Sequence, residues 1–168
     1  MTTLRDNLIS WLRDAYAMEG QAIELLETQI ERLENYPEAL PRLREHLQQT
    51  REQQTEVERC LDRLGADPST LKESAMKLGA SMQGMMHAMS SDEVLKHALG
   101  SHAFEQFEAG SYCSLKAAAE TAGEAEIART CERLMREEQD MARWVWEQLP
   151  HLTEQYLRRA ASGAEAKR

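Results

Sequence analysis

The sequence predicts an all-α protein built as a bundle of four long helices, and three observations support this. Only 4 prolines, 8 glycines and 2 phenylalanines occur beside abundant leucine, alanine, glutamate, glutamine and arginine, a composition that favours helices over strands. Apolar residues recur at steps of three and four in four long stretches, as they do on one face of an amphipathic helix. Proline, glycine and short polar segments separate these stretches. A chain of 168 residues is also long enough for one domain with a substantial core.

The first helix is expected over residues 3–35. Thr3 is a suitable N-cap, and Asp6 three residues later completes a capping-box pattern. The apolar stripe of this segment is interrupted once near its middle, by Glu19. Pro37 follows a polar residue pair and marks the end of the helix.

The second helix is expected over residues 37–64. Pro37 and Pro41 are tolerated only in its opening turn, where their missing N–H groups would have no helical partner. The centre of this helix, residues 48–54, contains no aliphatic side chain. Gly65 is a suitable helix stop.

The second half of the chain should form two more long helices after a crossover segment. Residues 69–89 are rich in methionine and are expected to form a shorter helix, alone or with a loop. A third long helix should end at Thr121, and a fourth should run over residues 124–149 until Pro150 stops it. Residues 151–161 are expected to form a short amphipathic extension.

The connections suggest how the four helices are arranged. Short links lie within each pair of helices, and one longer crossover joins the two pairs. This order is typical of a ferritin-like four-helix bundle with an additional crossover helix between helices two and three. We expect one domain over residues 1–161 and a frayed tail over residues 162–168.

Charge and cysteine content restrict the class of partner. The net charge of −9 argues against nucleic acid or an anionic membrane as the main partner, because both require a basic face. The start of the chain lacks a signal-peptide pattern, and no segment is apolar enough to span a bilayer. Cys60, Cys113 and Cys131 are odd in number and widely spaced, so they are expected to be reduced and mostly buried in a cytoplasmic protein.

Three acids interrupt apolar stripes near the middle of three different helices: Glu19, Glu105 and Glu138. A buried carboxylate without a partner is costly, so such an acid needs a cation, a proton or a metal ion. The alternative is that these acids reach solvent at an edge of the bundle. Di-metal bundles take one glutamate from each of two helices and a Glu-x-x-His pair from each of the other two. Here Glu105 and Glu108 form a Glu-x-x-Glu pair, but the chain has no Glu-x-x-His.

Several segments taken in order resemble one known family. From about residue 4 to residue 149, the chain is similar to the YciF-like ferritin-like proteins, small bacterial proteins associated with stress. The similarity depends on five segments of this sequence: residues 14–19, 46–51, 74–76, 104–112 and 134–140.

The resemblance implies a metal site that has partly degenerated. Glu19 and Glu105 match acids that bind metal in the family. In the second helix the family typically has a Glu-x-x-His where our alignment places Gln48 and Arg51. Glutamine is a poor ligand and arginine is none.

The ligand from the fourth helix is left open between two neighbouring acids. The alignment favours Glu137, whereas the apolar stripe favours Glu138. The departure in the second helix also suggests that Arg51 replaces the metal charge through bidentate ion pairs with the core carboxylates. Arg51→Ala would then destabilise the fold by roughly 3–5 kcal/mol.

Three functions are compatible with these residues. The first is a stress-associated ferritin-like protein that is non-enzymatic or binds metal weakly. The second is a di-iron or di-manganese protein with peroxide or oxygen chemistry, its ligands drawn from Glu19, Glu105, Glu108 and either Glu137 or Glu138. The third is a helical scaffold whose buried ionic network sets helix register. A homodimer and a protein partner are expected, and no catalytic residue is assigned.

Overall fold

The computed structural model describes residues 2–68 and 92–167 of the chain. This part consists of four long helices and one short 3₁₀ helix: α1 (Leu4–Arg32), η1 (Pro37–Ala39), α2 (Leu40–Arg63), α4 (Glu93–Thr121) and α5 (Ala125–Ala161). The predicted all-α four-helix bundle is confirmed. The crossover helix predicted over residues 69–89 lies outside the described residues.

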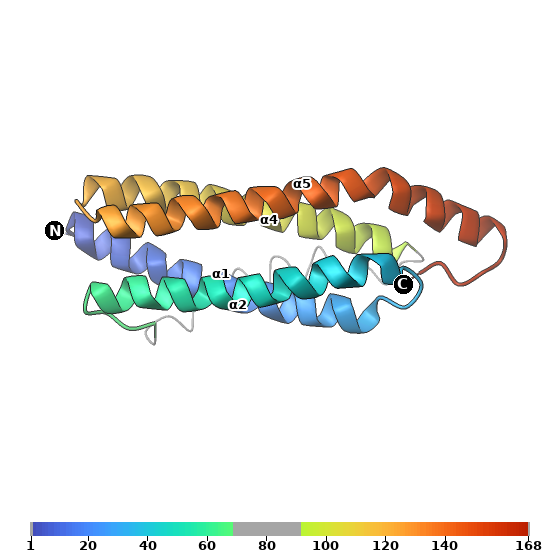
Figure 1. Cartoon of the computed structure of the whole chain (residues 1–168), viewed down its shortest axis with the longest axis horizontal. Coiled ribbons are helices and arrows are strands. Elements are labelled where there is room, and N and C mark those ends of the chain that lie inside the picture. Colours follow the sequence, from blue (N-terminus) through green and yellow to red (C-terminus); the bar gives the residue numbers. More distant parts are fainter. Residues whose placement is uncertain (1, 69–91, 168) are drawn as a thin grey trace.

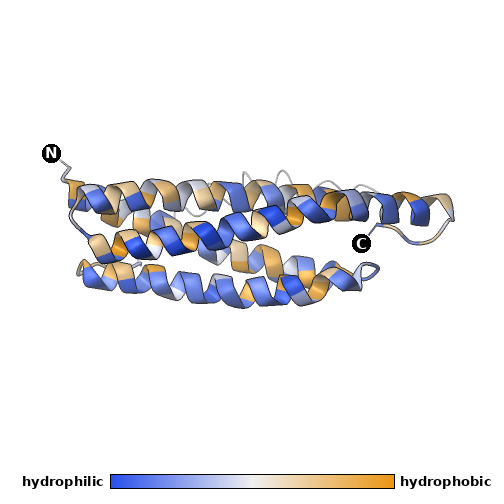
Figure 2. Ribbon diagram, turned by 45° about the horizontal axis from the view of Figure 1, so that its top comes forward, coloured by the Kyte–Doolittle hydropathy of each residue, from blue (hydrophilic) through white to orange (hydrophobic). Residues whose placement is uncertain are grey.

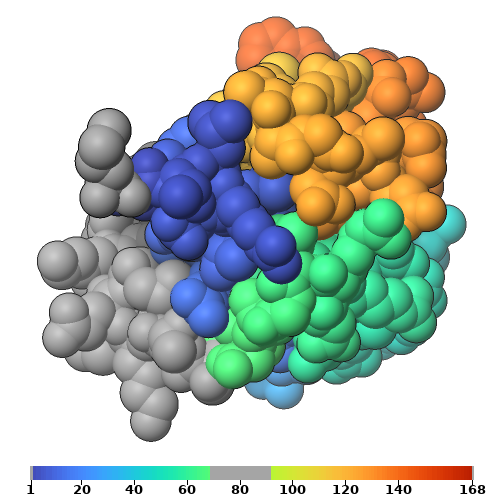
Figure 3. Space-filling view, turned by 90° about the vertical axis from the view of Figure 1, so that its left-hand side faces the viewer, coloured from blue at the N-terminus to red at the C-terminus, as the bar shows by residue number. Residues whose placement is uncertain are grey.

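The helices form two antiparallel hairpins that lie side by side along the long axis of the molecule (Figure 1). Within each hairpin, α1 packs on α2 and α4 packs on α5, and α1 also packs along α4. The end-on view in Figure 3 shows the start of α1, the end of α2 and the turn between α4 and α5 gathered at one end. No helix among residues 2–68 and 92–167 combines the length and apolar character needed to cross a membrane.

Local sequence signals set several of the helix ends. The predicted capping box is present, since the backbone N–H of Asp6 donates to Thr3 Oγ1 at 3.1 Å and that of Thr3 donates to Asp6 Oδ2 at 2.9 Å. At the α4–α5 turn, Gly123 adopts φ of +78°, which glycine tolerates best. The N–H of Glu124 then reaches the carbonyl of Ala119 at 2.8 Å, closing α4 with a Schellman motif.

A polar layer divides the bundle core into two apolar clusters. On α5, Leu134 belongs to one cluster and Met141 to the other, and Glu138 lies between them. The same succession of apolar, polar and apolar faces occurs on α1, where Glu19 separates Leu12 from Leu26. Figure 2 shows hydrophilic residues in the middle of the helices as well as on their outer faces. The apolar clusters hold the helices together, and the polar layer costs stability unless its groups find partners.

The predicted end of the fourth helix is wrong. The helix continues through Pro150 to Ala161 instead of stopping at Leu149. Proline removes one N–H donor, but Pro150 lies on the exposed face of α5. Beyond it, Leu152 packs against the second apolar cluster and so favours continuation of the helix.

Replacing Pro150 with alanine is expected to stabilise the protein by up to about 3 kcal/mol. Alanine restores the N–H donor that Pro150 lacks and removes the ring from the interior of the helix. Urea denaturation of Pro150→Ala and wild type would measure the difference. Pro41→Ala is the control and should change little, because Pro41 lies in the first turn of α2. A less stable Pro150→Ala variant would contradict the expectation.

The C-terminal tail was expected to fray, but its described residues fold back onto the bundle. The hydroxyl of Tyr36 donates to the carbonyl of Ala166 at 2.7 Å, and the N–H of Val94 donates to the carbonyl of Lys167 at 2.9 Å. The side chain of Lys167 also lies 3.4 Å from buried Glu93, which pairs with Arg32. These contacts involve tertiary partners, which local sequence does not reveal.

Candidate metal centre

Four glutamates occupy the polar layer, and none is more than 3% exposed. Glu19 comes from α1, Glu105 and Glu108 from α4, and Glu138 from α5. Glu105 and Glu108 are three residues apart, so both point from the same face of α4. The alternative that the predicted core acids reach solvent at an edge of the bundle is therefore wrong.

The second helix contributes three buried polar residues, His46, Thr50 and Gln53, of which His46 and Gln53 were not predicted to face the core. His46 Nε2 lies 3.2 Å from Glu105 Oε2 and 3.9 Å from Glu138 Oε2. One ligand atom from each of His46, Glu105 and Glu138 lies within 4.8 Å of the other two. This is the spacing of a set of side chains that share one small cation.

The other ring nitrogen of His46 has a polar neighbour of its own. Its Nδ1 lies 3.4 Å from Gln49 Oε1. A hydrogen on Nδ1 would point at this carbonyl and leave the Nε2 lone pair free to face the acids. Histidines that bind metal commonly have such an outer partner, which sets the tautomer and the ring orientation.

Neutral side chains donate hydrogen bonds to one oxygen of Glu19 and one oxygen of Glu138. The Tyr112 hydroxyl donates to Glu19 Oε1, and the Gln53 amide donates to Glu138 Oε1. The same amide donates to Glu137 Oε2 at 3.0 Å. These hydrogen bonds orient the two carboxyl groups without neutralising them.

The remaining carboxyl oxygens test whether a metal ion fits here. Glu19 Oε2, Glu105 Oε2, Glu108 Oε1 and Glu138 Oε2 are buried and accept no hydrogen bond. No lysine or arginine within residues 2–68 and 92–167 forms an ion pair with any of the four acids. Buried oxygens of this kind, next to an imidazole nitrogen, suit divalent iron, manganese or zinc. The residues therefore fit a divalent metal ion.

Burial and mutual repulsion favour protonation of these acids when no cation is present. The pKa of Glu19 is raised to about 8: burial is the main cause, the Tyr112 hydrogen bond opposes it, and the carboxylates of Glu105 and Glu137 add to it. Burial, then the neighbouring acids, raises the pKa of Glu108 and of Glu138 well above the usual range. Without a cation the layer therefore holds several protons near neutral pH.

The prediction that Arg51 lies among the core carboxylates is wrong. Arg51 is about half exposed, and its guanidinium pairs with Glu27 at 2.6 Å on the surface. Gln48 is also exposed and donates to Glu52. The alignment therefore assigned the wrong face of the second helix to the core. His46, Thr50 and Gln53 lie on the inward face instead.

Arg51→Ala is accordingly expected to change the free energy of unfolding by less than about 1 kcal/mol, because exposed ion pairs contribute little. This differs clearly from the larger loss expected if Arg51 neutralised the core. Urea denaturation would measure it, with Glu27→Ala as the matched variant of the same pair. A loss above about 3 kcal/mol would show that Arg51 supports the buried acids after all.

The structure also distinguishes the two acids left open on the fourth helix. Glu138 points into the core, whereas the side chain of Glu137 is 23% exposed and pairs with Arg133 at 3.1 Å. The apolar stripe was therefore the better guide than the alignment. Glu137 still touches the edge of the layer through Gln53.

His102 and the three cysteines lie outside the polar layer. His102 Nδ1 lies 3.0 Å from the carbonyl of Ala142, so it is a partly buried boundary residue one turn before Glu105. Cys113 is exposed, whereas Cys60 and Cys131 are buried. The expectation that the cysteines are mostly buried is therefore correct for two of the three.

Comparison with known proteins places this chain in a family. The model of a family described as a domain of unknown function, DUF892, matches residues 3–158. The chain belongs to the DUF892 family. This agrees with the predicted resemblance to YciF-like proteins, since the solved structures that resemble this DUF892 chain include the stress protein YciF of E. coli.

Three solved structures show how far the similarity extends. A protein from Xanthomonas campestris pv. campestris is 36% identical, with a TM-score of 0.81 over 95% of this chain and 99% of that one. YcfI from Rhodopseudomonas palustris is 25% identical, with a TM-score of 0.73 over 85% and 92% of the two chains. E. coli YciF is 18% identical, with a TM-score of 0.76 over 89% and 96%, and at this identity it supports the fold alone.

Proposed function

We propose that this DUF892 protein is a ferritin-like protein that binds a divalent metal ion within its polar layer. The observation that carries the proposal is the set of buried carboxyl oxygens without hydrogen bonds next to His46 Nε2. His46, Glu105 and Glu138 are the proposed primary ligands. Glu19 and Glu108 lie in the same layer and would complete the site or hold a second ion.

Charge supports a metal ion over an arrangement of protons alone. Without a cation the acids keep their protons only until the pH rises, and four ionised carboxylates would then carry four negative charges with no lysine or arginine of the described residues paired to them. A divalent ion offsets two and uses oxygen lone pairs that otherwise have no partner. The metal must displace the protons that the acids hold, so its affinity should increase with pH.

The protein's own residues orient the acids and exclude water from the site. Tyr112 holds Glu19, and Gln53 holds Glu138, so each acid presents its other oxygen to the layer. The apolar clusters on either side of the layer exclude bulk water. A bound redox metal would supply Lewis acidity or electron transfer to a small oxidant, which is the chemistry of the di-metal alternative.

The scaffold alternative has one observation in its favour. The raised pKa values of Glu108 and Glu138, both caused first by burial, allow a network of shared protons that needs no metal. Such a network would serve only to set the register of the four helices. It predicts a protein that takes up no metal ion and is not stabilised by one.

Metal content is the test of the proposed function. Protein purified without a metal-affinity tag would be loaded anaerobically with Fe(II) or Mn(II), passed over a desalting column and measured by elemental analysis. We expect at least one ion per chain and a higher melting temperature, because a ligand that binds only the folded state stabilises it. No retained ion and no thermal shift would overturn the metal proposal in favour of the scaffold.

The biological setting is also part of the proposal. The resemblance to YciF-like proteins, one of which is described as the E. coli stress protein YciF, supports a role in bacterial stress, and a cytoplasmic location remains the expectation from the sequence. The exposed side chains of Trp11 and Phe107, 46% and 48% accessible, lie next to the same hollow between α1 and α4. They support an interface, for which the expected homodimer is our first candidate.

A further inference from the structure

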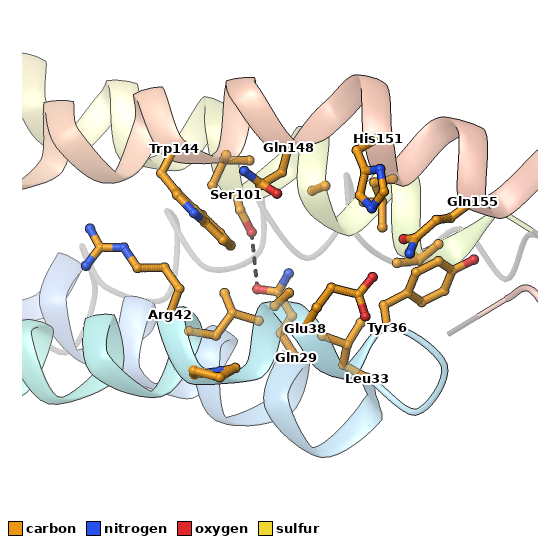
Figure 4. Close-up of a pocket in the computed structure, with 17 residues that line it drawn as sticks. Gln29, Leu33, Tyr36, Glu38, Arg42, Ser101, Trp144, Gln148, His151 and Gln155 are labelled. Carbon is orange, nitrogen blue, oxygen red and sulfur yellow. Dashed lines mark hydrogen bonds between the residues drawn. The ribbon is translucent and has the colours of Figure 1, made fainter.

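A separate cavity lies near the end of the bundle where α1 turns into α2. It has a volume of about 340 Å³, is lined by residues of α1, η1, α2, α4 and α5, and is partly open to solvent. Figure 4 shows Trp144 and Gln148 projecting from α5 toward the opposite wall, which carries Gln29 and Tyr36. It adjoins the second apolar cluster, whereas the four acids lie in the layer beyond that cluster.

The inner lining of the cavity is apolar with a few neutral polar groups. Aliphatic side chains such as Leu43, Val94 and Val145 form much of the wall. Ser101 donates to Gln29 Oε1 at 3.3 Å across it (Figure 4). Gln155 also lines the cavity, and its Oε1 is a buried acceptor that receives no hydrogen bond.

Three side chains that can carry charge also line the cavity, but each is exposed to solvent or already paired. Glu38 and His151 are exposed, and Arg42 already pairs with Glu45 at 2.8 Å. A charged ligand inside the cavity would therefore lack a counter-ion, and its desolvation would not be offset. The lining instead suits a neutral molecule with an apolar body and a hydrogen-bond donor.

We propose that this end cavity is a binding site for an uncharged, flat, largely apolar small molecule that donates a hydrogen bond to Gln155. A cavity of this volume takes a molecule of roughly 15–20 non-hydrogen atoms. The aromatic side chains of Trp144 and Tyr36 line the wall and would contact a flat ring. This site is separate from the metal centre, so its test does not depend on whether the protein binds a metal ion.

The test uses two probes that share one skeleton. N-phenyl-1-naphthylamine is neutral, carries one N–H donor and fluoresces strongly only in apolar surroundings. Its analogue 1-anilinonaphthalene-8-sulfonate adds one negative charge. Titration of the full-length protein should show saturable binding of the neutral probe at one site per chain, and at least about tenfold weaker binding of the charged one.

Variants locate the binding within the cavity. Ala98→Phe and Gln148→Phe each fill part of the cavity from a different helix and should weaken binding of the neutral probe at least about tenfold. Gln155→Leu removes the acceptor and should weaken it about two- to tenfold. Ala117→Phe adds the same ring at an exposed position of α4 outside the cavity and should leave binding unchanged.

Circular dichroism and thermal unfolding would establish that each variant is folded. If Ala98→Phe fails to fold, Gln148→Phe at the more exposed wall still tests the site. Absence of saturable binding, or equal binding by wild type and folded Gln148→Phe, would overturn the proposal. Equal affinity for the neutral and charged probes would overturn the assigned ligand class.

Discussion

In metal-free protein, the free energy of unfolding is expected to fall as the pH rises from about 5 to 8. Burial raises the pKa of Glu19 from an ordinary value of 4.5 to about 8 in the folded protein. Between these values the folded state binds a proton that the unfolded chain releases. The stabilisation is fully present below pH 4.5 and is lost as the pH rises through about 8.

The size of the effect should make it easy to detect. One proton of difference changes the unfolding free energy by about 1.4 kcal/mol per pH unit, so the raised pKa of Glu19 accounts for a loss on the order of 3–4 kcal/mol between pH 5 and 8. Glu108 and Glu138, with pKa values raised chiefly by burial, act in the same direction. The three acids repel one another, so their contributions are not simply additive.

Urea denaturation at several pH values in the presence of a chelator would measure this. The range from pH 5 upward avoids the titration of acids whose pKa is lowered in the folded protein, because these acids stabilise it less as the pH falls. Burial alone would raise the pKa of Glu93, but hydrogen bonds from Arg32 and Lys167 outweigh it and lower this pKa, so Glu93 loses its stabilising effect only in more acidic solution. Glu19→Gln should show a flatter dependence, by roughly 1.4 kcal/mol per pH unit. Stability that is constant or rises between pH 5 and 8 would contradict the expectation.

The second large effect is expected for Glu138→Gln, which should stabilise the metal-free protein while abolishing metal binding. The amide has the shape of the acid and can still accept the hydrogen bond from Gln53. At pH 8, folding of the wild type must either protonate Glu138 or bury its charge, and the amide avoids both costs, so the metal-free variant should gain about 1–4 kcal/mol. The substitution also removes a charged ligand, so metal affinity should fall by more than about 100-fold.

The neighbouring acid provides a matched variant. Glu137→Gln makes the same chemical change on the same helix, but Glu137 is partly exposed and already paired with Arg133. It should retain metal binding within about tenfold of wild type. Calorimetric titration with Mn(II) or Co(II), together with urea denaturation in chelator, would measure both properties. If Glu138→Gln kept the metal affinity and Glu137→Gln lost it, the assignment of the core ligand would be reversed.

Opposite changes in stability and binding would distinguish a metal centre from a scaffold. A residue kept only for structure should lower stability when it is replaced. A residue kept for binding commonly costs stability in the unliganded protein. Four buried carboxylates with one histidine and no lysine or arginine paired to them among the described residues are difficult to explain by stability alone.

The sequence by itself determined much of the fold and part of the candidate site. The capping box at Thr3 depends on neighbours within one turn, so it could be predicted locally. Glu19, Glu105 and Glu138 were found because each interrupts a strongly periodic apolar stripe, and rotation about the helix axis then places it in the core. For the same reason Glu138 could be favoured over Glu137, whose side chain is rotated about 100° away.

Only the tertiary structure decided which residues of α2 join the site. Residues 48–54 contain no aliphatic side chain, so periodicity there does not define the inward face. Steps of three and four from Leu43 to Val57 pass through His46, Thr50 and Gln53, but they also allow routes through neighbouring polar residues. Packing against α1 and α5 selected one rotation, which buried His46 and left Arg51 in solvent. The continuation of α5 past Pro150 has the same physical reason, because contacts distant in sequence outweighed a local helix-breaking signal.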